Sequence, residues 1–175
     1  MAKPLVRQAR SMLEGHGLGE LTDAPGMIAD ALATPARPLP QIEVRSVCDP
    51  ATRSAFAHIT SIAFEVPGII CRDVYGAERA WDNSFRGFVA YVDGMAVATT
   101  AIVVAAGVAG VYSVGTLPGY RGRGYAEALM RQALDRVRGE TGVERTALQS
   151  TRTGYSLYTR MGYRAVTNFT VYITD

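Results

Sequence analysis

At residues 114–126 the chain reads Val-Gly-Thr-Leu-Pro-Gly-Tyr-Arg-Gly-Arg-Gly-Tyr-Ala. A β-branched apolar run ends in this turn, and an amphipathic helix follows it. The start of a helix leaves about four backbone N–H groups unpaired and carries the positive end of the helix dipole, which favours a bound phosphate. Gly122 and Gly124 allow an anion to approach the backbone closely, and Arg121 and Arg123 add positive charge. This stretch therefore predicts a strand, an anion-binding turn and a helix.

The helix after the turn has a clear apolar face. Its apolar residues recur at three- and four-residue spacing, which is typical of an amphipathic helix. Glu127 and Arg131 lie one helical turn apart, as a favourable i,i+4 pair. The apolar positions are Ala126, Leu129, Met130, Ala133, Leu134 and Val137. This face predicts that the helix packs against the core and holds the turn rigidly.

Three kinds of phosphate-binding turn are rich in glycine, and spacing separates them. A dinucleotide-binding fingerprint needs a third glycine at the position of Glu127. A nucleoside-triphosphate loop needs Gly-Lys-Ser or Gly-Lys-Thr, and the sequence contains neither. The pattern left is Arg121-x-x-Gly124-x-Ala126. A tight strand-to-helix turn that binds no ligand stays open as the alternative.

A second pattern lies downstream. Residues 145–174 predict a strand, a short helix and a closing strand, and the helix ends in Tyr-Thr-Arg-Met-Gly-Tyr at residues 158–163. Together the two patterns resemble the motifs of the GNAT superfamily of acetyl-CoA-dependent N-acetyltransferases. The first is similar to Gln/Arg-x-x-Gly-x-Gly/Ala and the second to Tyr-x-x-x-Gly-Phe/Tyr. The resemblance is strong over residues 85–174, weak over 41–84 and absent over 1–40.

The resemblance implies an α+β fold with a mixed, mostly antiparallel sheet flanked by helices on both faces. In this family two neighbouring strands splay apart, and the exposed backbone of one pairs with the pantetheine arm of acetyl-CoA as an added strand would. Here that backbone belongs to residues 114–116, and we expect Gly115 to form the bulge that starts the splay. Ordinary sheet pairing of these residues is the alternative. The residues implied to bind acetyl-CoA are Val114, Gly115, Thr116, Arg121, Gly122, Arg123, Gly124, Tyr125, Ala126, Glu127 and Thr151.

Acetyl transfer needs a proton donor and an oxyanion site. An amine must attack the thioester, the tetrahedral oxyanion must be stabilised, and the thiolate must leave with a proton. The motif match assigns the proton donor to Tyr158, because a phenol of pKa about 10 keeps its proton at neutral pH. The backbone N–H of Thr116 is the predicted oxyanion donor. A tyrosine that only packs under the sheet is the alternative for Tyr158.

The sequence leaves two candidates for the general base. Many members of the family carry Glu or Asp on the splayed strand, but residues 110–117 contain no carboxylate or histidine. Glu65, at the predicted end of a helix, or a chain of waters would then accept the proton of the ammonium. The missing carboxylate also leaves open a CoA-binding sensor or regulatory module that has lost turnover.

The acceptor side of the predicted cleft combines aromatic residues with few charges. The residues expected there are Phe64, Glu65, Trp81, Tyr91, Tyr112 and Gln149. Trp81 and Phe64 could equally fill the core, which is the commoner place for such side chains. The predicted reaction is transfer of an acetyl group from acetyl-CoA to a primary amine of a small molecule or peptide.

The composition fits a small enzyme. The 175 residues carry a net charge of +2, and 19% of them are charged, so no broad basic field for nucleic acid is expected. The two cysteines lie in no Cys-x-x-Cys motif, so neither a metal site nor a disulfide framework is expected. Residues 95–114 are uncharged, but their Val, Ile and Thr content and a Gly-rich break predict two strands rather than a membrane span. We expect a cytoplasmic protein, since residues 1–14 do not resemble a secretory signal.

The chain is expected to divide at residue 40. Residues 1–40 predict an N-terminal arm or linker, because residues 15–40 are rich in Pro and Gly and unsuited to a core element. Within it, Leu5–Glu14 predicts a short helix. Residues 27–32 predict a turn or two of helix that docks on the domain or on a second copy, which favours a homodimer. Residues 41–175 predict the acetyltransferase domain.

The first half of that domain carries ordinary signals for its elements. An alternating run predicts a strand over residues 42–47, and Asp49 or Pro50 starts a helix. A second helix is expected over residues 69–81. The pair Asp93-Gly94 predicts a two-residue hairpin turn between two strands.

Overall fold

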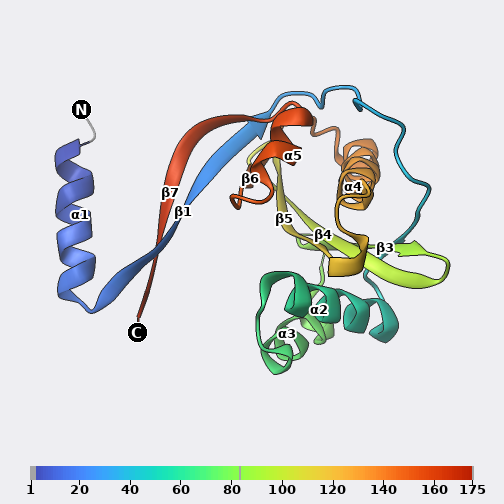
Figure 1. The fold of residues 1–175 in the computed structure, drawn as a ribbon, viewed down its shortest axis with the longest axis horizontal. Coiled ribbons are helices and arrows are strands. Elements are labelled where there is room, and N and C mark those ends of the chain that lie inside the picture. Colours follow the sequence, from blue (N-terminus) through green and yellow to red (C-terminus); the bar gives the residue numbers. More distant parts are fainter. Residues whose placement is uncertain (1–2, 83, 175) are drawn as a thin grey trace.

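The computed structural model describes residues 3–82 and 84–174, and Figure 1 shows a body with a ribbon of chain extending from it. Its helices are α1 (Lys3–Gly15), α2 (Pro50–Phe64), α3 (Gly68–Tyr75), η1 (Glu78–Ala80), η2 (Pro118–Tyr120), α4 (Tyr125–Thr141) and α5 (Tyr155–Arg160). Its strands are β1 (Leu18–Ala29), β2 (Glu43–Ser46), β3 (Arg86–Val92), β4 (Met95–Ala105), β5 (Val108–Thr116), β6 (Thr146–Gln149) and β7 (Arg164–Thr174).

The strands form one open sheet in the order β2-β3-β4-β5-β6-β1-β7. Every neighbouring pair is antiparallel except β5 and β6, which run parallel and are joined by the crossover helix α4. A parallel pair needs such a crossover, whereas the antiparallel pairs can be joined by short turns. The predicted mixed, mostly antiparallel sheet is therefore confirmed.

Helices cover both faces of this sheet. The apolar stripe of α4 packs on one face, where Leu129, Met130 and Ala133 are fully buried beside residues of β3, β4 and β5. On the other face α2 buries Phe56 and Ile59 against a separate apolar cluster. The predicted apolar face of α4 thus holds the turn at its start in a fixed place over the sheet.

Local signals in the first half of the domain also hold. The side chain of Asp49 accepts a hydrogen bond from the backbone N–H of Thr52 at 2.8 Å, which caps α2. Asp93 and Gly94 both take positive φ, +50° and +76°, as a two-residue hairpin turn between β3 and β4 requires. The second helix is shorter than expected, because α3 ends at Tyr75 and only the short η1 follows.

The uncharged run at residues 95–114 forms the hairpin of β4 and β5, as its composition predicts. In the part of the chain that the structure describes, none of the helices has the length and apolar character needed to cross a bilayer.

The prediction that the Pro- and Gly-rich segment contributes no core element is wrong. Residues 18–29 form β1, whose inner end lies between β6 and β7 and buries Met27 and Ala29 in the core. The predicted helical turn over residues 27–32 is also wrong, since the first three of these residues belong to the strand. Pairing with strands from the far end of the chain overrides the weak local propensity here. The division into two domains at residue 40 stays a prediction.

The outer part of β1 forms a two-stranded ribbon with β7. From Leu18 to Ala24, β1 pairs with β7 and with no other strand of the described chain, and this ribbon and α1 extend away from the body in Figure 1. The predicted helix at the N-terminus is present as α1. The guanidinium of Arg10 binds the carboxylate of Glu20 at 2.6 Å, which ties α1 to the ribbon.

Candidate functional site

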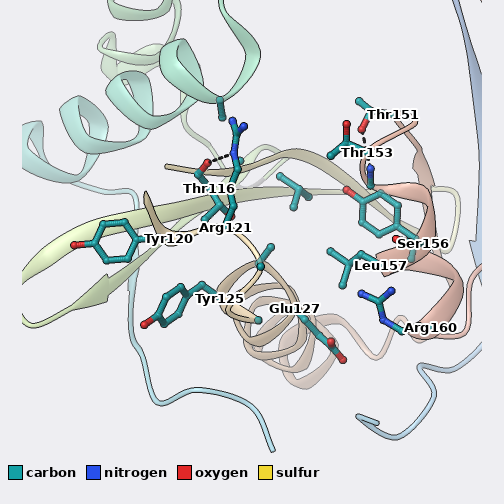
Figure 2. Close-up of a pocket in the computed structure, with 18 of the residues that line it drawn as sticks. Thr116, Tyr120, Arg121, Tyr125, Glu127, Thr151, Thr153, Ser156, Leu157 and Arg160 are labelled. Atoms are coloured by element: carbon teal, nitrogen blue, oxygen red, sulfur yellow. Dashed lines mark hydrogen bonds between the residues drawn. The ribbon is translucent and has the colours of Figure 1, made fainter. Parts of the chain in front are cut away.

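A cavity of about 460 Å³ opens between β5, the turn before α4, the start of α5 and the end of α2. Figure 2 shows residues of these elements arranged around it. The predicted site residues that line it are Glu65, Val114, Gly115, Thr116, Arg121, Gly122, Gly124, Tyr125, Ala126, Glu127, Thr151 and Tyr158. Residues as far apart in the sequence as Glu65 and Tyr158 therefore come together in one place.

The splay of β5 from β6 creates one wall. The two strands pair only from Ala109 to Val111, and β5 continues to Thr116 with no partner on that side among the described residues. The predicted bulge is present but its position is wrong: the register shifts at Ser113 and Val114 rather than at Gly115. Ser113 takes a φ of +50°, and this left-handed residue lets the strand bend away from β6.

Gly115 has a packing role instead. A Cβ atom at this position would lie 2.9 Å from the Cβ of Ala63 and 3.1 Å from the Oγ1 of Thr99. The absence of a side chain therefore lets the end of α2 approach β5 closely. This contact brings Phe64 and Glu65 to the rim of the cavity.

The direction of the backbone groups on β5 follows from its pairing. The N–H of Leu117 donates to the carbonyl of Val97 at 3.0 Å, so the backbone of Thr116 points the opposite way, into the splay. In agreement, the carbonyl of Thr116 accepts a hydrogen bond from the Nε of Arg121 at 3.1 Å, which Figure 2 draws as a dashed line. The N–H of Thr116 therefore faces the cavity, as an oxyanion donor must.

The turn before α4 has the form of an anion cradle. Gly122 and Gly124 take φ values of +74° and +87°, which few other residues adopt without strain. Gly124 is the N-cap of α4, and none of the described side chains caps this helix start by a hydrogen bond. The first N–H groups of α4 thus stay available to an external anion. These residues fit a pyrophosphate group.

The charged side chains around the cradle favour a bound anion. The carboxylate of Glu127 is buried and binds the guanidinium of Arg131 at 2.9 Å, so its negative charge is offset within the helix. Arg121 lines the cavity with its guanidinium anchored on Thr116. Arg123 does not line the cavity; its guanidinium lies over the ring of Tyr120, 5.7 Å from the centroid. Its role in binding stays a prediction.

Tyr158 lies in α5 at the opposite wall and is only 7% exposed. Burial raises the pKa of its phenol to about 12, with a smaller contribution from Tyr163, whose ring centroid is 6.0 Å away. A Cβ atom on Gly154 would lie 2.7 Å from the ring of Tyr158, so this glycine gives the ring its place. The Oγ1 of Thr151 accepts a hydrogen bond from the N–H of Gly154 at 3.1 Å and fixes the start of α5 (Figure 2). Tyr158 is therefore a protonated, firmly held phenol at neutral pH.

Glu65 occupies a strained position at the end of α2. Its φ of +57° and ψ of +32° are left-handed, and its N–H caps the helix by donating to the carbonyl of Ser61. The residue is exposed and lines the cavity. Glu65 and Glu127 are the carboxylates among the described lining residues, and Glu127 is already paired with Arg131. Glu65 is thus the lining carboxylate that forms no ion pair with a described residue.

Of the residues expected on the acceptor side, the structure brings together Phe64 and Glu65 alone. Trp81 and Tyr91 belong to the apolar core under α2, where the indole N–H of Trp81 donates to the carbonyl of Tyr75. Tyr112 and Gln149 are exposed and line neither the main cavity nor the smaller one beside it. A tryptophan surrounded by apolar residues fills core space more often than it binds a ligand, and it does so here.

Other lining residues were not foreseen. Thr153, Ser156, Leu157 and Arg160 come from the start and the inner face of α5 and are labelled in Figure 2. Arg37 comes from the segment between β1 and β2, and its Nη2 donates to the carbonyl of Gly122 at 3.4 Å. The residues of α5 could have been found from the helical spacing around Tyr158. No local signal marks Arg37.

Comparison with known proteins gives a consistent picture. The model of the acetyltransferase (GNAT) family matches residues 54–163. Comparison with curated proteins gives no match. Among solved structures, a GCN5-related N-acetyltransferase from Kribbella flavida is similar, with a TM-score of 0.66 and 22% identity over 91% of this chain and 60% of that chain.

Two further structures share the fold. A putative acetyltransferase of the GNAT family from Novosphingobium aromaticivorans has a TM-score of 0.61 and 23% identity over 88% of this chain and 65% of that chain. The ribosomal-protein-S18-alanine N-acetyltransferase of Escherichia coli has a TM-score of 0.59 and 19% identity over 73% of this chain and 80% of that one. The chain thus spans about 60% of the length of the Kribbella protein.

Proposed function

The chain belongs to the acetyltransferase (GNAT) family, and we propose that it transfers an acetyl group from acetyl-CoA to a primary amine of a small molecule or peptide by direct attack. The observation that carries this proposal is the meeting of an uncapped helix start with a splayed strand in one cavity. The first feature suits a pyrophosphate, and the second offers backbone groups to an extended amide-containing arm.

Acetyl-CoA would supply the thioester, and residues of three elements would hold it. The N–H groups at the start of α4 and the guanidinium of Arg121 would bind the pyrophosphate. The backbone of Val114 would pair with a pantetheine amide, and the N–H of Thr116 would stay available to the thioester carbonyl. Apart from its two chain neighbours, no described residue has an atom within 4 Å of a Cβ placed on Gly122, so this side of the turn is open.

The reaction forms a bond between the amine nitrogen and the thioester carbonyl carbon, and breaks the bond between that carbon and sulfur. The N–H of Thr116 stabilises the oxyanion that develops on the carbonyl oxygen. Tyr158 donates its phenolic proton to the leaving sulfur. A phenol of pKa about 12 is a weak acid toward a thiolate of pKa about 8.5, so transfer completes only as a new proton reaches the phenol.

The amine must reach the site as a free base. An alkylammonium has a pKa of about 10, so at neutral pH it has to lose a proton before attack. Glu65 accepts this proton, directly or through water, because it is the lining carboxylate that no described arginine binds. Its exposed position lets the proton pass on to solvent.

Replacement of Tyr158 by Phe tests the assignment of the acid. We expect Tyr158→Phe to bind CoA with unchanged affinity and to lose about 10²-fold in turnover, the usual effect of removing a positioned proton donor. Turnover is measured as thiol release from acetyl-CoA with a panel of primary amines, and CoA affinity by calorimetry. Equal rates in the two proteins, or a loss confined to CoA affinity, would return Tyr158 to a packing role.

The same panel separates the enzyme from a sensor. The absence of a carboxylate or histidine at residues 110–117 favours, as the second candidate, a CoA-binding regulatory module. Such a module would bind CoA but release no thiol above background with any amine. Thiol release that depends on both the amine and Tyr158 would exclude it.

A further inference from the structure

A second cavity lies beside the proposed active site, between the end of α2, α3 and β5. Its volume is about 330 Å³. Phe64, Val66, Ile70, Val74 and Tyr75 form most of its wall. This volume is at the small end of the range for ligand pockets, so it suits a side group rather than a whole cofactor.

The described residues in the wall of this cavity include no Asp, Glu, Lys, Arg or His. Its polar groups are hydroxyls of Thr60, Tyr75 and Ser113 and the thiol of Cys71, and burial raises the pKa of that thiol. The hydroxyls of Tyr75 and Ser113 lie 3.5 Å apart. A charged group placed here would lose its hydration without gaining an ionic partner from the described lining residues. The cavity therefore selects an uncharged, mainly apolar occupant.

The second cavity adjoins the first at the reacting centre. Phe64 lines both cavities, and the consecutive residues Ser113 and Val114 each line one of them. These two residues form the bulge at which β5 leaves β6. An acceptor whose amine lies beside Val114 in the first cavity can thus extend past Phe64 and place its other groups in the second cavity.

The outer wall of the cavity exposes apolar side chains that no described residue covers. Ile70 and Val74 of α3 are 51% and 49% exposed, and Phe64 is 41% exposed. Exposed apolar groups that cluster around a hollow mark binding sites on soluble proteins. Ile70 and Val74 belong to the short helix α3, which begins at Gly68, three residues after Glu65, the proposed base.

We propose that this second cavity holds an aliphatic or aromatic group of the acceptor, so that the acceptor is an amine with an apolar side group. The inference rests on the proposed function and names its substrate class. The amine nitrogen lies in the main cavity between Glu65 and Val114, and the apolar group lies against Ile70, Val74 and Tyr75. Uncharged walls exclude acceptors whose second group is ionic.

A homologous series of straight-chain amines tests the proposal. These amines have almost the same amine pKa, so they differ in apolar length alone. From ethylamine to pentylamine we expect kcat/KM to rise about fourfold for each added methylene, the ratio that corresponds to about 0.8 kcal/mol for a buried methylene. Thiol release measures the rate. A series with no dependence on length would overturn the proposal.

Two neighbouring isoleucines of α3 provide a matched pair of variants. Ile70 lines the cavity, whereas Ile69 does not, although it is exposed to a similar degree, 60%. We expect Ile70→Ser to reduce by at least half the slope of log kcat/KM against the number of methylenes in the amine. Ile69→Ser should leave this slope unchanged. Equal effects of both substitutions, or none from Ile70→Ser, would contradict the assigned wall.

Direct binding separates this inference from the proposed reaction. Trp81 is the single tryptophan of the chain, and its ring lies 6.0 Å from that of Tyr75 in the cavity wall. Pentylamine added to the CoA complex should change its fluorescence in the wild type and in Ile69→Ser, and less so in Ile70→Ser. These fluorescence changes without any acetyl transfer would support binding of the amine in the second cavity and refute the proposed reaction. No fluorescence change, together with a dimer that dissociates in Ile70→Ser, would show that a second copy covers the surface.

Discussion

The turn between β5 and α4 and the ribbon of β1 and β7 both contain glycine and β-branched residues, yet they fold for different reasons. The turn follows from neighbouring residues: a strand, two left-handed glycines and an amphipathic helix in direct succession. The inner end of β1 lies between residues 146–149 and 164–174, from the other end of the chain. Local sequence determines the first region, and long-range pairing determines the second.

This difference explains which parts of the fold could be predicted. Spacing in α4, the Asp49 cap and the Asp93-Gly94 turn each act within a few residues, so the sequence shows them directly. Leu18–Ala29 contains Pro25 and two glycines and lacks alternation, which argues against a strand. The strand forms because β6 and β7 supply partners on both sides of its inner end.

The site divides in the same way. The lining residues of the turn before α4 and Tyr158 could be located because their motifs are short and local. The bulge lies at Ser113, because the exact position depends on how β5 pairs with β4 across the hairpin. The sequence allows Trp81 to lie in the core or in the cleft, and the packing of its ring against Phe56 places it in the core. Arg37 reaches the cavity because β1 carries the chain across the sheet.

Deletion of β1 gives the largest expected effect. It tests whether pairing with β6 and β7 makes this strand part of the core. A chain that lacks residues 1–30 leaves β6 and β7 without their shared neighbour and removes Met27 and Ala29 from the core. We expect this chain to be insoluble or to lack a cooperative thermal transition by circular dichroism.

A chain that lacks only residues 1–16 is the matched control. It loses α1 and the exposed ion pair of Arg10 with Glu20, which contributes no more than about 1 kcal/mol. Its melting temperature should stay within about 5 °C of the full chain. If the chain that lacks residues 1–30 unfolds cooperatively at the temperature of the full chain, β1 is dispensable. The prediction that residues 1–40 form an arm outside the core would then be correct.

Truncation of Met27 examines β1 with a single side chain. Met27 is only 1% exposed, so Met27→Ala should lower the free energy of unfolding by about 2–5 kcal/mol through lost packing and a cavity. Met12 of α1 is 61% exposed, and Met12→Ala should change the free energy of unfolding by less than about 0.5 kcal/mol. Urea denaturation measures both values. Similar values for the two variants would contradict the core position of β1.

Substitution of Gly124 tests the turn between β5 and α4, the region that local sequence determines. Valine is strained at a φ of +87°, and its Cβ would lie 3.2 Å from Cδ of Pro40. We expect Gly124→Val to weaken CoA binding by about 30-fold, equivalent to about 2 kcal/mol, through displaced N–H groups. Calorimetry measures the affinity, with circular dichroism to confirm the fold. Gly119→Ala, in the same turn but with open space around it, should bind CoA normally. Normal affinity in a folded Gly124→Val protein would refute the cradle.

Arg37 links the two regions and gives the smallest expected effect. It lies in the segment that connects β1 to β2, yet it lines the cavity and donates to the carbonyl of Gly122. Because its side chain is exposed, an ionic contact with a phosphate of CoA contributes less than about 1 kcal/mol, so Arg37→Ala should weaken CoA binding about threefold.

Salt distinguishes an ionic contribution of Arg37 from a packing effect. Screening of an exposed contact should abolish the difference between Arg37→Ala and the wild type near 1 M salt, where the Debye length is about 3 Å. Arg45→Ala is the control, since Arg45 is also exposed but binds Glu43 on the edge strand β2. It should leave CoA affinity unchanged at every salt concentration. A loss in Arg37→Ala that persists at high salt would mean that Arg37 acts by holding the turn, and the connection between the two regions would then be one of packing rather than charge.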